Sequence, residues 1–218
     1  MRLGIKPAAF LGRLLVFFFL TYALWAPVEP AYTRVLTALS RGFLRVTEAL
    51  SFDPASRNVT EMRVRETEEG RPAIYFQHRR YPQVQSGIPA EWVQANLVLL
   101  IPLMLATPAA SYRQRFGRLG LALVIAVFLQ VLDVTVTVKA LYARTVPGYG
   151  DVARRLYQFG DAFTQGMDTQ LFPFAIWAGI HLRQLLGRGV AASPAGSSRS
   201  SRGAPGRRLV GGKTRAKS

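Results

Sequence analysis

The 218-residue chain contains no cysteine and only two histidines, His78 and His181. Without cysteine it cannot form a disulfide, a thiolate nucleophile, a cysteine-linked haem or a cysteine-rich zinc site. The histidines are far apart and lack a His-x-x-x-His or Glu-rich helical pattern, so we expect no metal site. A Gly-rich phosphate loop and a Ser/His/Asp set are missing too. We therefore expect a protein that is not an enzyme and needs no cofactor.

Acidic residues are scarce and unevenly placed. The chain has 28 Lys and Arg against 12 Asp and Glu, a formal net charge of +16, and acids are absent from residues 1–28, 111–118 and 169–218. Charges nearly balance in residues 29–92 and 139–168. Lys and Arg near helix ends mark the cytoplasmic side of a membrane, whereas long translocated loops escape this rule. We predict that both termini are cytoplasmic and that the two balanced regions are outside.

Four long apolar stretches are the main positive feature of the sequence. A bilayer core needs about 20 mostly apolar residues per helix. We predict an α-helical integral membrane protein with four transmembrane helices and a small extracytoplasmic α+β insertion. The predicted spans are residues 8–28, 93–110, 119–138 and 169–186. They are separated by an extracytoplasmic domain 29–92, a cytoplasmic loop 111–118 and an extracytoplasmic loop 139–168, and flanked by a cytoplasmic N-terminus 1–7 and a disordered basic cytoplasmic tail 187–218. A basic soluble protein that binds nucleic acid is the alternative. Apolar runs such as Leu97–Ile101 would be hard to bury in so small a soluble core.

The first apolar stretch has a signal peptide's basic start and apolar middle. Pro27 and Pro30 follow Trp25 and make a poor cleavage context. We interpret residues 8–28 as an uncleaved anchor whose helix ends at these prolines, with a cleaved signal as the alternative.

The predicted extracytoplasmic domain begins with a helical pattern and continues with strand patterns. Apolar residues recur at the 3–4 spacing of an amphipathic helix, at Val35, Leu36, Leu39, Phe43, Val46 and Leu50. This helix lies flat on the outer leaflet or caps the bundle; a core helix of a small outer domain is the alternative. Alternation in residues 58–67, a turn at Glu68–Pro72 and the β-prone Ala73–His78 predict a β-hairpin.

Charged residues are dense on the predicted hairpin. Glu61, Glu66, Glu68 and Glu69 stand against Arg63, Arg65 and Arg71, which indicates cross-strand surface pairing. If the hairpin is a docking surface, Arg63 and Arg65 are its candidate partner-binding residues. The basic tail either contacts anionic lipid headgroups or is a solvated tail that only keeps the C-terminus cytoplasmic, and we expect no specific binding of nucleic acid.

Asp133 is the one acidic residue inside a predicted span. Helical spacing places Gln130, Asp133 and Thr137 on one face. Counted from the inner loops at 1.5 Å per residue, Asp133 lies about 21 Å up its span and Asn96 about 18 Å up the neighbouring one. We interpret the pair as an interhelical clasp contributing ~0.6–2 kcal/mol. A proton or substrate site at this intramembrane polar face is the alternative.

Three stretches carry a resemblance to a known family. They are Leu24–Val28, Leu97–Pro108 with its internal proline, and Phe172–Trp177. With the order of spans and outer segment, residues 8 to about 186 resemble the exosortase H-associated group of small integral membrane proteins. The resemblance implies an accessory role, with an exosortase as possible partner, in sorting proteins of a Gram-negative envelope. Exosortases resemble transpeptidases that use a Cys, so this cysteine-free chain is not the sortase itself.

The leading hypothesis is thus a non-enzymatic accessory protein of the bacterial inner membrane, in an exosortase-linked sorting system. A transporter or permease component that uses the Asp133 face is the first alternative. A membrane enzyme with an outer active site around His78 and the acidic residues is the second.

Overall fold

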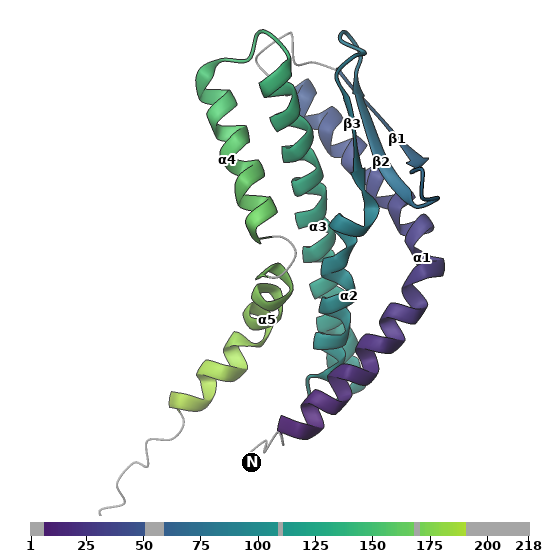
Figure 1. Cartoon of the computed structure of the whole chain (residues 1–218). Helices are drawn as coiled ribbons and strands as arrows, with labels where there is room; N and C mark the ends of the chain where they lie inside the picture. The colour runs from purple at the N-terminus through teal and green to yellow at the C-terminus, as the bar shows by residue number, and fades with distance from the viewer. Residues whose placement is uncertain (1–6, 51–58, 109–110, 168–170, 191–218) are drawn as a thin grey trace, which may run out of the picture. The chain divides into compact units, whose positions relative to one another are not determined.

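A computed structural model describes residues 7–50, 59–108, 111–167 and 171–190. These residues form five helices and three strands (Figure 1), in the order α1 Pro7–Ala49, β1 Thr60–Glu66, β2 Pro72–His78, β3 Gln85–Pro89, α2 Ala90–Ala106, α3 Tyr112–Thr145, α4 Asp151–Met167 and α5 Leu171–Val190. The chain divides into two compact units, Met1–Arg183 and Gln184–Ser218. The first unit holds all the contacts described below.

Two of the helices, α1 and α3, are long and apolar enough to cross a membrane. Their 43 and 34 residues correspond to about 65 and 51 Å of helix at 1.5 Å per residue. A bilayer core is only about 30 Å thick, so both helices would extend well beyond it. The other two predicted spans fall on shorter apolar helices, α2 and the Leu171–Leu182 part of α5.

The prediction that the first helix ends at Pro27 and Pro30 is wrong. Both prolines lie inside α1, which continues to Ala49. A proline inside a helix removes one backbone hydrogen bond and bends the axis, and α1 changes direction near its middle (Figure 1). The helix continues because its second half packs against the sheet.

The second half of α1 is helical as predicted, but most of its predicted apolar residues lie off the buried face. Residues that point into the protein include Thr33, Leu36, Thr37, Ser40, Leu44 and Glu48. Of the predicted apolar residues, Leu36 is buried and Phe43 is half-buried, whereas Val35, Leu39, Val46 and Leu50 are exposed. At 100° per residue, the buried face is rotated by roughly 100° from the predicted one. This segment is a core helix, the alternative interpretation above, since Leu36 and Leu44 pack in the core cluster and Glu48 accepts hydrogen bonds from Val59 and Thr60.

The predicted hairpin is confirmed as β1 and β2, with Gly70 in the left-handed conformation (φ 74°) at the turn. A third strand, β3, was not predicted because Gln85–Pro89 contains one apolar β-former beside Gly and Pro. The sheet is antiparallel with the order β1-β2-β3. Gly87 pairs with Tyr75, and a Cβ at Gly87 would lie 3.1 Å from the Tyr75 ring, so a larger residue there would require the ring to shift by a few tenths of an ångström.

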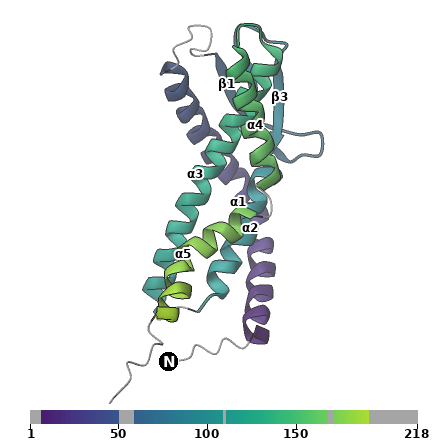
Figure 2. The same cartoon turned by 90° about the vertical axis from the view of Figure 1, so that its left-hand side faces the viewer.

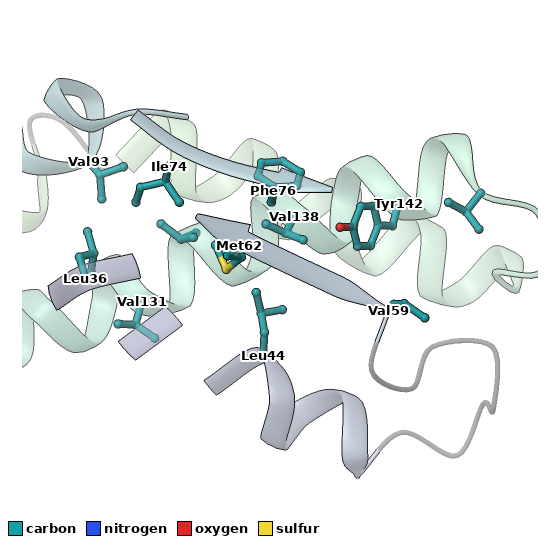
Figure 3. Packing of buried hydrophobic residues seen from close by; sticks show 12 residues of the cluster. Leu36, Leu44, Val59, Met62, Ile74, Phe76, Val93, Val131, Val138 and Tyr142 are labelled. Atoms are coloured by element: carbon teal, nitrogen blue, oxygen red, sulfur yellow. The ribbon is translucent and has the colours of Figure 1, made fainter. Parts of the chain in front are cut away.

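The inner face of the sheet packs against α1 and α3 (Figure 3), through a core cluster that includes Leu36, Leu44, Met62, Ile74, Phe76, Val134, Val138 and Tyr142. A second cluster joins α2, α3 and α5 through Leu97, Leu100, Met104, Ala122, Ala126 and Ile176. Because α3 contributes to both clusters, it connects the apolar helices to the sheet.

Several predicted loops are helical. The predicted loop 111–118 contains only one non-helical residue, Ser111, whose hydroxyl oxygen accepts a hydrogen bond from the Gln114 N–H at 3.2 Å and begins α3. The predicted loop 139–168 contains the end of α3 and the whole of α4, which lies beside α3 (Figures 1 and 2). Continuing a helix satisfies its own backbone groups, which favours long helices near a membrane. The predicted disordered tail, 187–218, is wrong for residues 187–190, which belong to α5; the rest lies outside the described residues.

Candidate functional site

A cavity of about 420 Å³ lies between β3, the beginning of α2, and α3 and α4. Its walls are largely apolar, with Phe76, Ile88, Trp92, Val93 and Leu141 among them. Its polar side chains are Ser86, Asp133, Thr137, Arg144 and Asp161. Concave, mostly apolar sites with a few convergent polar groups are typical ligand sites, with volumes of about 300–1,000 Å³.

The cavity carries more negative than positive charge. Asp133 and Asp161 are both buried, at 8% and 4% exposure. Arg144 from α3 pairs with Asp161 from α4, with 2.9 Å between Nη2 and Oδ2. The lining of the cavity thus contains two carboxyl side chains and one guanidinium.

The predicted polar face of α3 is divided between two sites. Asp133 and Thr137 line the large cavity, while Gln130 and Asn96 line a small pocket beside it. Gln130 accepts a hydrogen bond from the Tyr32 hydroxyl and donates to the Val93 carbonyl at 2.7 Å. The proposed bond between Asp133 and Asn96 stays a prediction.

Interhelical clasps of the predicted kind occur, with other residues. Trp25 Nε1 donates to Gln94 Oε1 at 3.1 Å, and Gln94 Nε2 donates to Thr33 Oγ1 at 2.7 Å. With the bonds of Gln130, these contacts join α1, α2 and α3. Each such bond contributes ~0.6–2 kcal/mol between helices. Gln94 was not singled out because one amide near a span end is an ordinary sequence feature.

A buried ion pair lies beneath the sheet. Glu48 of α1 and Lys139 of α3 have side-chain exposures of only 2% and 6%, and their Oε1 and Nζ atoms are 2.9 Å apart. Glu48 also accepts hydrogen bonds from the backbone N–H of Val59 at 3.0 Å and from the Thr60 hydroxyl. In the sequence both residues looked like ordinary charges of the outer regions. The two residues are 91 positions apart in the sequence, so no local sequence pattern indicates that they pair.

His78 belongs to the same buried region. Its side chain is 1% exposed, and its Nδ1 accepts hydrogen bonds from the backbone N–H groups of Arg80 and Tyr81, both at 3.2 Å. Burial lowers the pKa of His78 below its ordinary 6.5, with Lys139 and Arg80 adding to the effect and Glu48 opposing it. Both the geometry and the lowered pKa favour a neutral imidazole.

The predicted acidic partners of His78 lie elsewhere. Glu61 is on the exposed outer face of β1, where it pairs with Arg79 at 3.1 Å and Arg63 at 3.7 Å. Cross-strand charge pairing on the surface is thus present for Glu61. His78 points to the inner face of the sheet, so the structure does not bring it together with Glu61 in one site.

The candidate docking residues Arg63 and Arg65 share the exposed outer face of β1. The Arg65 guanidinium lies 5.4 Å from the centre of the Tyr75 ring, a cation–π contact. Alternation along the strand had placed the two arginines on one face, and their positions are as predicted.

Two helix faces expose apolar residues in regular stripes. On α4, Val152, Leu156, Phe159 and Phe163 recur every three or four residues and are 47% to 82% exposed. On the second half of α1 and the turn that follows it, Val35, Leu39, Val46 and Leu50 are 46% to 73% exposed. We call these the α4 stripe and the α1 stripe. Such spacing keeps each set on one side of its helix.

Comparison with known protein families, with curated proteins and with solved structures finds no match. Within the described residues, no group of three or more His, Asp or Glu is arranged to hold a metal ion. The class therefore rests on the fold, a mostly helical protein with two long apolar helices and a small three-stranded antiparallel sheet.

Proposed function

We propose that this chain is a non-catalytic accessory subunit of a membrane complex, which docks to a membrane partner protein through the α4 and α1 stripes. The partner class that the sequence resemblance suggests is an exosortase of the bacterial inner membrane. In this proposal the sheet and α4 form an extracytoplasmic head, and both termini are cytoplasmic.

The α4 stripe is the observation that carries the proposal. β3 is an edge strand, paired only with β2 among the described residues. An open strand edge is not tolerated in hydrocarbon, which supports placing β3 outside the membrane core. Asp161 of α4 lines the same cavity as β3, so α4 lies at the same level. Four large apolar side chains would then face water, a costly arrangement unless a protein covers them.

The α1 stripe supports the same conclusion. The second half of α1 buries Leu36 and Leu44 on one face, together with polar residues such as Glu48, and leaves the four apolar residues of the α1 stripe exposed. Burial of apolar area contributes about 25 cal/mol per Å², so a helix favours this arrangement when a second apolar surface is available. A partner helix in the same membrane would provide such a surface.

The test is co-purification from native membranes in mild detergent, quantified by mass spectrometry. Leu156→Glu places a charge in the α4 stripe and should reduce the amount of co-purified partner at least tenfold. Ala162→Glu is the matched control, because Ala162 is exposed and lies roughly 90° around α4 from the stripe. Equal partner recovery with both variants would refute docking through α4. Weaker membrane retention of Leu156→Glu, with the partner unchanged, would show that lipid covers this face.

A transport component is the second candidate function, favoured by the position of Asp133 at a cavity. The two candidates differ in the identity of the co-purified protein. An exosortase supports the first, whereas an ATPase or permease subunit supports the second.

A further inference from the structure

The cavity between β3, α3 and α4 has the features of a site for an extended peptide. Four consecutive residues, Ser86 to Pro89, line it. Successive side chains of a strand point to opposite faces of the sheet. The cavity touches residues of both faces of β3 and also Phe76 of β2, so it reaches from beneath the sheet to the edge of β3. A strand edge offers its outward N–H and C=O groups to an added strand, as in β-augmentation.

The side chains that surround this edge select the charge of the ligand. Asp133 and Asp161 are nearly fully buried, and the one guanidinium, on Arg144, is paired with Asp161 at 2.9 Å. A positively charged group entering the cavity would meet a net negative charge. Trp92, 66% exposed and also lining the cavity, adds an aromatic ring of the kind that attracts cations most strongly.

We infer that this cavity binds an extended peptide segment of another protein, which pairs with the edge of β3 and places a Lys or Arg side chain near Asp133. The five residues of β3 match a peptide of about five residues, or ~17 Å of strand. The inference goes beyond the proposed function, because docking through the α4 and α1 stripes requires nothing to enter the cavity.

The test uses the full chain, purified in detergent and immobilised, with four pools of random pentapeptides. Each pool has Lys, Arg, Leu or Glu fixed at its central position. The Lys and Arg pools should be retained at least fivefold more than the Leu and Glu pools. Pools with N-methylated backbone nitrogens cannot donate hydrogen bonds to β3 and should lose this retention. Failure of every pool to bind, equal retention of all four, or undiminished binding of N-methylated pools would overturn the inference.

Matched variants separate charge recognition from folding. Asp133→Asn keeps the shape of the side chain and should reduce the Lys and Arg pools to the level of the Leu pool. Arg144→Gln frees Asp161 from its ion pair and should increase retention of the cationic pools severalfold. Unchanged selection in both variants would contradict the inference. Leu156→Glu should keep peptide selection while losing the membrane partner, so that failure of the two proposals can be told apart.

Discussion

The buried pair Glu48–Lys139 allows a prediction whose size follows from the structure. Glu48→Gln leaves the Lys139 ammonium buried without a carboxylate. Lys139→Met leaves Glu48 with hydrogen bonds from Val59 and Thr60, so part of its charge stays compensated. Removing one partner of a buried ion pair costs about 3–5 kcal/mol. We expect Glu48→Gln at the upper end of this range and Lys139→Met at the lower end.

The double variant provides the decisive comparison. Glu48→Gln combined with Lys139→Met removes both charges together, and replacing a whole buried pair is often neutral or stabilising. It should therefore be clearly more stable than either single variant. In the double-mutant cycle, its loss of stability should be smaller than the sum of the two single losses.

The assay is the thermal-aggregation midpoint of the purified protein in detergent. In a chain of this size 1 kcal/mol corresponds to about 2–4 °C, so the single variants should lower the midpoint by about 6–20 °C. The double variant should recover most of that loss. Single variants within 2 °C of the original protein, or a double variant whose loss is the sum of the two, would refute the buried pairing.

Two further predictions concern the sheet. His78 is held neutral with a lowered pKa, so the unfolded chain binds its proton more readily; the midpoint should fall as the pH drops below about 6.5, and His78→Asn should remove that part of the pH dependence. A midpoint that does not change with pH in this range, or an equal fall of the midpoint at low pH in His78→Asn, would contradict a neutral, buried His78. Gly87→Ala pushes a methyl group against Tyr75 and should cost ~1–3 kcal/mol; the cost should shrink in a Tyr75→Ser background, and an equal cost there would place the strain elsewhere.

The hairpin was predictable because its signals are local. Alternating residues on both sides of a turn with Gly70 require only a short stretch of sequence. The course of α1 was not predictable from local signals, because Pro27 and Pro30 indicate a helix end, and only packing against the sheet outweighs them. The buried face of α1 was misassigned for a related reason. Its polar residues are buried because partners such as Lys139 come from a distant helix.

The candidate site was predictable in part. Asp133 and Thr137 stand out as polar residues in an apolar run, and the structure places both at the cavity. Arg144 and Asp161 lie in residues 139–168, which the sequence presented as a loop, so their convergence needed the helical course of α3 and α4. Trp92 looked like a residue at the start of a span. Its place beside β3 depends on a strand that propensity did not indicate.

The most direct test of the central claim is labelling of single cysteines in spheroplasts with a membrane-impermeant maleimide. The cysteine-free sequence makes each introduced thiol the only target. We predict that Arg63→Cys is labelled, that Phe116→Cys is protected until the membrane is permeabilised, and that Leu156→Cys is labelled only in a strain lacking the co-purified partner. Labelling of Phe116→Cys in place of Arg63→Cys, or equal labelling of Leu156→Cys with and without the partner, would contradict an outer head that docks through α4.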